Sequence, residues 1–297
     1  MHKMALKLGA NSINKLYLGS TAINKAYLGA GILFSGGFSP ASLFAGGQQG
    51  LWLEVVQSGE FYPASLFAGG TDGAWFDPSD LSTLFQDSAG TTPVTASGQH
   101  VGKMLDKSGN GNHATQATSS KRTTYTEGGG LSWLAFDGVD DEMDAVIGWD
   151  VDGPVYMAIA GSTETTTSNL GFLSVNPGST VSRTRRSIAI QTGTSLKADA
   201  RGGNKAIVNI IADSINVIEA LFEPDSSTIS AAKNGASYTT VSQALSNTST
   251  SVRFGVGVID ASTQINLYGA ILRNVAPDAS NRASVASYLA NKSGVTL

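Results

Sequence analysis

The stretch Asp137-Gly138-Val139-Asp140-Asp141-Glu142 gathers acidic side chains that could do metal chemistry. Carboxylate and carbonyl oxygens are the ligands that Ca²⁺ prefers, so the stretch is a candidate calcium site. The alternative is a tight turn in which the carboxylates accept hydrogen bonds from backbone amides. We expect the turn, and we predict neither a cofactor nor a metal, with calcium as the open alternative.

Four residues are candidates for direct ligand binding: Trp149, Arg183, Arg185 and Arg186. Trp149 lies beside a loop, where an exposed indole can stack on a sugar ring. The arginines form the one dense basic cluster, and guanidinium groups pair with carboxylates and phosphates. This cluster could meet an anionic glycan or a lipopolysaccharide phosphate, or it could be a solvated loop or a subunit contact. By contrast, we expect Trp75 and Trp133 to lie in the core.

Residues suited to nucleophilic catalysis are scarce. The chain has no cysteine, and its three histidines are His2, His100 and His113. His100 has no evident partner, and His113 is expected to be either packed or exposed in a turn. No glycine-rich phosphate loop and no pair of histidines at metal-binding helical spacing occurs. We therefore predict no catalytic residues and expect that the chain is not an enzyme.

The composition favours a β-protein with an uncharged polar surface. Charged residues make up 14% of the 297 residues, against about 25% in an average globular protein. A net charge of −4 gives no electrostatic basis for binding nucleic acid. No run approaches the roughly 18 apolar residues of a membrane span, and the first residues lack the apolar stretch of a signal peptide.

Two internal repeats organise the front of the chain. Leu8-Gly9 returns as Leu18-Gly19 and Leu28-Gly29, a period of ten. An even period places equivalent residues on the same side of an extended chain. Residues 1–36 are therefore expected to form short strands that need a partner surface, either a docking partner or the main domain.

The second repeat marks a junction. Residues 40–47, Pro-Ala-Ser-Leu-Phe-Ala-Gly-Gly, return unchanged at 63–70. The Gly-Gly pairs and the prolines are typical of linkers. We assign residues 37–72 to this junction and residues 73–297 to the main domain.

The main domain carries many short strand patterns separated by glycine-rich turns, which predicts an all-β sandwich or barrel. The clearest patterns are 101–105, 133–136, 155–159, 207–211, 215–222, 252–258 and 265–272. Two helices are expected, a short one near residues 79–84 and a longer one over Asp278–Lys292. Asp278 can cap the start of the longer helix, and Gly294 can end it.

Several stretches resemble motifs of concanavalin A-like, laminin-G-type jelly rolls. They are residues 105–114, 134–141, 231–235 and 267–274. The resemblance implies a concanavalin A-like β-sandwich with a short C-terminal helix, preceded by an N-terminal β-repeat segment. This fold serves lectins, glycan hydrolases and adhesion modules alike. Glucanases of this fold carry Glu-x-Asp-x-x-Glu. Here Glu142 and Asp144 match that motif, but Ile147 stands where the acid should be.

The front end resembles phage proteins. Residues 15–29 are similar to short repeats near the start of phage tail and fibre proteins, and residues 73–87 look like a phage structural protein with this jelly roll. The resemblance implies a virion protein made in the host cytoplasm, and among virion parts a tail-fibre or receptor-binding component. It would bind other virion proteins through residues 1–36 and contact a host-surface carbohydrate, as a homo-oligomer, most simply a trimer. The alternatives are a purely structural capsid-decoration or tail-assembly protein and a glycan depolymerase.

Overall fold

The computed structural model describes residues 61–147, 149, 153–163, 171–175, 186–192, 195–200, 205–209, 214–245, 251–255 and 264–297, and four short strands between residues 7 and 23. The chain divides into two compact units, Met1–Glu54 and Val55–Leu297. In the first unit, β1 (Lys7–Leu8) pairs with β2 (Asn11–Ser12), and β3 (Leu16–Leu18) pairs with β4 (Thr21–Ile23). These antiparallel hairpins follow the ten-residue period of the sequence. The repeat around Leu28-Gly29 lies outside the described residues.

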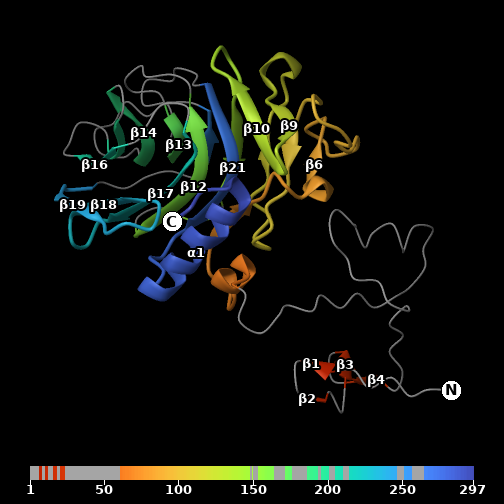
Figure 1. Ribbon diagram of the computed structural model, residues 1–297, viewed down its shortest axis with the longest axis horizontal. Coiled ribbons are helices and arrows are strands. Elements are labelled where there is room, and N and C mark those ends of the chain that lie inside the picture. Colours follow the sequence, from red (N-terminus) through yellow and green to blue (C-terminus); the bar gives the residue numbers. More distant parts are fainter. Residues whose placement is uncertain are drawn as a thin grey trace. The chain divides into compact units, whose positions relative to one another are not determined.

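The second unit is a sandwich of two antiparallel sheets (Figure 1), which confirms the predicted fold class. The strand order of the first sheet is β19 (Thr239–Ser242), β18 (Thr228–Lys233), β17 (Asn216–Glu223), β12 (Val155–Thr163), β21 (Gln264–Arg273), β10 (Leu131–Asp137) and β9 (Thr124–Gly128), and β5 (Gly73–Phe76) also pairs with β21. We call it the eight-stranded sheet.

The strand order of the nine-stranded sheet is β16 (Lys205–Asn209), β15 (Ser195–Ala200), β14 (Arg186–Thr192), β13 (Gly171–Val175), β20 (Ser251–Phe254), β11 (Met143–Val146), β8 (Ala114–Thr115), β7 (Lys103–Met104) and β6 (Leu84–Phe85). The main hydrophobic core fills the space between the two sheets, with Phe76, Phe136, Phe172, Phe222 and Phe254 among its members. Inward side chains alternate with outward ones along the strands, as a two-layer fold requires.

The helix α1 (Ala279–Ser293) is close to the helix that the sequence predicts. The Asp278 carboxylate accepts a hydrogen bond from the Asn281 amide at 2.8 Å. Gly294 ends the helix in the left-handed region at φ 70°, where a residue without Cβ is favoured. The helix expected near residues 79–84 is the 3₁₀ turn η3 (Leu81–Thr83). Further 3₁₀ turns are η2 (Pro63–Phe67) and η4 (Ser119–Lys121). No helix in the described part of the chain is long and apolar enough to cross a membrane.

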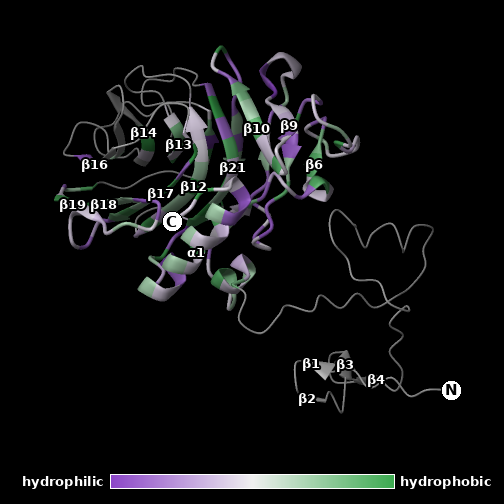
Figure 2. Ribbon diagram, in the orientation of Figure 1, coloured by the Kyte–Doolittle hydropathy of each residue, from purple (hydrophilic) through white to green (hydrophobic). Residues whose placement is uncertain are grey.

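A second apolar cluster covers the outer side of the eight-stranded sheet. Val285, Ala286, Leu289 and Ala290 of α1 and Leu66 and Phe67 of η2 pack against strand residues such as Tyr156 and Ile271. In Figure 1, α1 lies across β12 and β17, and Figure 2 shows hydrophobic and hydrophilic residues interspersed along it. Burial of side chains such as Val285 and Leu289 contributes about 1.5–3 kcal/mol each. The helix therefore closes one outer face of the sandwich.

The sandwich unit begins at Val55 and not at residue 73, where the linker-like composition places the boundary. The reason lies in η2, since Leu66 and Phe67 are buried in the second cluster. The Phe67 ring sits so close to Gly73 that a Cβ there would lie 2.4 Å from it. The second copy of the duplicated segment is thus part of the folded domain, although its glycines and proline are typical of a linker.

The loop that follows β7 fastens β5 to the sandwich. The Asp106 carboxylate accepts hydrogen bonds from the backbone amides of Trp75 (2.9 Å), Ser108 (2.8 Å) and Asn112 (2.9 Å). The Asn112 side chain donates to the Gly73 carbonyl at 2.8 Å. His113 is half-buried, and its Nδ1 accepts a hydrogen bond from the Asp106 amide at 3.1 Å, so it has a structural role in this loop.

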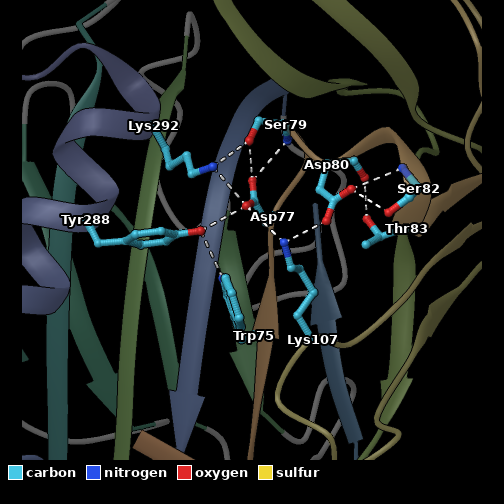
Figure 3. Close-up of polar contacts among 9 residues, drawn as sticks. All are labelled: Trp75, Asp77, Ser79, Asp80, Ser82, Thr83, Lys107, Tyr288 and Lys292. Atoms are coloured by element: carbon cyan, nitrogen blue, oxygen red, sulfur yellow. Dashed lines mark hydrogen bonds and ion pairs between the residues drawn. The ribbon is translucent and has the colours of Figure 1, made fainter. Parts of the chain in front are cut away.

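A buried carboxylate joins this loop to the C-terminal helix (Figure 3). Asp77 is 3% exposed. Its Oδ2 accepts a hydrogen bond from the Tyr288 hydroxyl at 2.9 Å and lies 3.0 Å from Lys292 Nζ and 3.5 Å from Lys107 Nζ. Burial alone would raise the pKa of Asp77, but the two lysines and Ser79 outweigh it and hold the pKa below its ordinary value. Asp77 therefore stabilises the fold in its ionised form.

We predict that Asp77→Ala lowers the free energy of unfolding by about 3 kcal/mol at pH 7, because it removes one partner of a buried ion pair. A carboxyl with a lowered pKa stabilises the fold above its ordinary pKa, and this contribution is lost as the pH falls through the folded-state value. The difference from the unaltered chain should therefore shrink below pH 4. Urea unfolding at pH 7 and below pH 4 measures this difference in the free energy of unfolding, with Asp225→Ala, at an exposed position, as the control. An equal loss at both pH values would contradict the account.

Candidate functional site

The outer face of the nine-stranded sheet carries a continuous row of outward side chains. Seven of these residues are paired with one another across neighbouring strands, from β6 to β14, and we call them the cross-strand row. They are Phe85, Lys103, Thr115, Asp144, Arg253, Ser174 and Ser187. Their chain neighbours Leu84, Met104, Ala114, Met143, Phe254, Leu173 and Ile188 point the other way, into the main core. Because α1 and η2 pack on the other sheet, the row lies on the opposite face of the sandwich, which we call the open face because neither of these two elements covers it.

Arg253 organises the charges at the centre of the row. Its Nη2 donates to Asp144 Oδ2 at 2.8 Å, and its Nη1 lies 3.1 Å from Glu142 Oε2. Lys121 Nζ in turn lies 3.1 Å from Glu142 Oε1. The side chains of Arg253, Glu142 and Asp144 are 26%, 16% and 40% exposed. Charge-assisted pairs of this kind hold planar groups in fixed orientations, so the row presents donors and acceptors in a fixed geometry.

The two ends of the row differ in chemistry. Phe85, on the edge strand β6, is partly exposed and offers an aromatic ring. At the other end, Ser174 and Ser187 are 0% and 1% exposed, so that end of the row is covered and cannot be reached from solvent. The Ser187 hydroxyl makes no hydrogen bond within the described residues. The part of the row that a ligand can reach therefore runs from Phe85 to Arg253, with an aromatic ring at one end and charged groups at the other.

The interpretation of Trp149 as an exposed sugar-stacking residue is wrong. Trp149 is 4% exposed and belongs to the main core. The strand β11 explains this, because Met143, Ala145, Ile147 and Trp149 are spaced by two and all lie in that core. The same spacing places Glu142 and Asp144 outward, so the alternation in the sequence could have identified both facts.

The arginine candidates remain predictions. Arg183 and Arg185 lie outside the described residues. Arg186 is the first residue of β14, and its side chain is likewise outside the described part. Sequence reasoning missed Arg253, which is the guanidinium at the centre of the row. Its signal was the alternation of Val252 and Phe254 around it.

The acidic cluster is the turn that the sequence predicts. Asp137 Oδ1 accepts hydrogen bonds from the backbone amides of Val139 (2.8 Å), Asp140 (3.3 Å) and Asp141 (3.3 Å). Ligand oxygens of Asp137, Asp140 and Asp141 lie within 4.8 Å of one another, a donor set that suits Ca²⁺. The backbone amides already account for the geometry, so no metal is needed to explain it.

Comparison with known proteins shows similarity in fold to solved structures of low sequence identity. No family model matches the chain, and no curated protein matches it. A mutant GH54 α-L-arabinofuranosidase soaked with 4-nitrophenyl α-L-arabinofuranoside is similar at a TM-score of 0.58 with 14% identity, over 78% of this chain and 66% of that chain. An arabinofuranosidase complexed with arabinofuranosyl-α-1,2-xylobiose is similar at a TM-score of 0.60 with 14% identity, over 78% of this chain and 65% of that chain. The chain thus spans just under two thirds of these proteins.

These likenesses correct the expectation that the chain is not an enzyme. That expectation rests on the missing acid at Ile147 and on the scarcity of histidine. Yet the arabinofuranosidases that share the fold are glycoside hydrolases, so the fold is compatible with hydrolysis. The absence of one glucanase motif is therefore no ground for excluding an enzyme.

The acidic turn yields a test of its electrostatics. Burial raises the pKa of Asp141 to about 6, with the like charges of Asp137 and Asp140 acting in the same direction. A carboxyl with a raised pKa destabilises the fold when it is ionised, so stability is lost as the pH rises through that value. Asp141→Asn keeps an acceptor for the Asp137 amide and should raise the free energy of unfolding by about 1–2 kcal/mol at pH 7.

The gain from Asp141→Asn should vanish near pH 4, where Asp141 is protonated in the folded chain. Urea unfolding in EDTA measures it without any contribution from divalent cations. A loss of stability at both pH values would show that the ionised carboxylate is needed by the turn.

Proposed function

We propose that the sandwich binds glycan along the cross-strand row. The observation that carries this proposal is the row itself, with Arg253 held between Asp144 and Glu142 on the open face of the nine-stranded sheet. Carbohydrate hydroxyls both donate and accept hydrogen bonds, and paired planar side chains can satisfy both roles at once. An aromatic ring such as Phe85 adds an apolar surface for the C–H face of a sugar. The fold is also that of proteins solved with arabinose-containing ligands.

A second candidate function is hydrolysis of the bound glycan. The observation that favours it is the pair Glu142 and Asp144, two carboxylates at the start of β11 that both lie beside Arg253. Glycoside hydrolases use two carboxyl groups that flank the scissile bond. Binding and hydrolysis make different predictions for Glu142→Gln, since only turnover needs a group that transfers a proton or attacks the sugar.

We further propose that the chain is a bacteriophage virion protein, of the tail-fibre or receptor-binding kind. The ten-residue repeats supply the support, because such short hairpins bury too little apolar surface to be stable alone and need a partner. In this proposal, residues 1–36 dock on other virion proteins, the sandwich faces a host-surface carbohydrate, and the protein assembles as a trimer. A capsid-decoration or tail-assembly protein with a purely structural sandwich is the competing proposal.

Glycan arrays with the full-length chain test the binding proposal. Arabinose-containing oligosaccharides and bacterial surface polysaccharide fragments are suitable probes. We expect Arg253→Gln and Phe85→Ala each to weaken binding about tenfold, which corresponds to about 1.4 kcal/mol. Lys233→Gln, on β18 of the other sheet, should leave binding unchanged. Binding that is indifferent to both row variants, or no binding to any glycan, would refute the proposal and favour the structural alternative.

The same oligosaccharides distinguish binding from hydrolysis. Release of reducing sugar that disappears in Glu142→Gln would establish turnover at the row. Retention of binding in Glu142→Gln, with no reducing sugar from the unaltered chain, would establish a binding module.

The docking proposal has its own test. Ile13→Asp combined with Ile23→Asp places charges on equivalent positions of two repeats, and we expect this variant to be absent from assembled particles. The thermal unfolding of the sandwich unit should not change, since that unit closes its own core. Incorporation at normal copy number would assign docking to another segment.

A further inference from the structure

A cavity of about 320 Å³ opens between α1 and the turn that joins β18 to β19. It lies on the helix-covered side of the eight-stranded sheet, so it is distinct from the cross-strand row. Its walls are made of small residues, among them Gly235, Ala236, Ala279 and Ala283. This volume is at the lower end of the range for small-molecule sites, about 300–1,000 Å³, which suits one sugar ring better than a chain of sugars.

The floor of the cavity is a buried carboxyl group. Glu219 of β17 is 4% exposed. Its Oε1 accepts hydrogen bonds from the Tyr156 hydroxyl at 2.6 Å and the Tyr238 hydroxyl at 3.1 Å. Within the described part of the chain, Oε2 accepts none, and Glu219 lines the cavity. Burial raises the pKa of Glu219, against the lowering effect of both tyrosines and Arg282. A carboxyl group this buried needs hydrogen-bond partners, and the cavity leaves room for one more.

The rim of the cavity carries a cation. The Arg282 guanidinium packs over the Tyr238 ring, 5.0 Å from its centre, so a ring face fixes its position. Arg282 forms no ion pair with any described residue. A stacked guanidinium keeps its N–H edge available for a planar anion such as a carboxylate. The cavity therefore offers one anion-binding group at its mouth and one polar acceptor at its base.

We propose that this cavity binds a single acidic monosaccharide unit of the uronic-acid type. The sugar carboxylate would pair with Arg282, and a ring hydroxyl would donate to Glu219. A neutral sugar could use only the second contact, so the cavity would select for the acidic one. The proposal extends glycan recognition to a second site, and it does not depend on the cross-strand row.

Galacturonic acid and galactose form a matched pair of probes, because they differ only in the group at C6. Binding to the full-length chain can be followed by titration calorimetry or by ligand-observed NMR. We expect galacturonate to bind at least about tenfold more tightly than galactose. Arg282→Gln should abolish that preference. Ala283→Leu, which fills the cavity from an exposed helix position, should weaken the binding of both sugars. Arg253→Gln is the control that separates this site from the row, and it should leave galacturonate binding unchanged.

Equal affinity for the two sugars would overturn the proposal, as would a preference that survives Arg282→Gln. Loss of galacturonate binding in Arg253→Gln, with no effect of Arg282→Gln, would assign the acidic sugar to the row instead. Failure of array binding at the row, with galacturonate selectivity intact, would refute the function proposed above and leave this one standing.

Discussion

The fold depends on the burial of the outer face of the eight-stranded sheet. That face carries Tyr156, Ile271 and Leu221, which would be an aggregation-prone apolar surface if they were left in water. The helix α1 and the turn η2 cover it, and Asp77 fastens the helix to β5 and to the loop after β7 through Tyr288, Lys292 and Lys107. Because this cover occupies one side of the sandwich, the cross-strand row lies on the other side.

The same arrangement explains why polar chemistry gathers in two places. On the nine-stranded sheet, β7, β8, β11 and β20 send alternate side chains into the core and outward, so Arg253, Asp144 and Thr115 fall into one row without any loop to position them. Beneath α1, Glu219 is buried by the helix that also supplies Arg282. A rigid sheet and a packed helix position these groups more precisely than loops do. Both proposed sites therefore rest on the elements that hold the fold together.

Much of this architecture could be predicted from the sequence, because strand alternation and helix caps are local signals. Asp278 and Gly294 marked the ends of α1 correctly, and the acidic turn at Asp137 was identified by its residue types. The start of the domain could not be predicted in this way, because only tertiary packing shows that Leu66 and Phe67 of a linker-like segment are buried. Trp149 was predicted to be exposed because its neighbours in the sequence resemble a loop. Its two-residue spacing from Ile147 and Ala145, which lie in the core, indicates burial instead. The alternation of Val252 and Phe254 could have shown that Arg253 points outward, but its pairing with Asp144 and the burial of Glu219 depend on strand pairing, which no short pattern specifies.

We propose that glycan lies on the open face of the nine-stranded sheet. Amide hydrogen exchange of the full-length chain, measured with and without a neutral oligosaccharide selected on the array, tests it directly. Bound ligand slows exchange where it covers or rigidifies backbone. We expect slower exchange in β7, β8, β11 and β20, with α1 and η2 unchanged. Slower exchange confined to α1, η2 or the β9–β10 hairpin would place the ligand elsewhere and contradict the account.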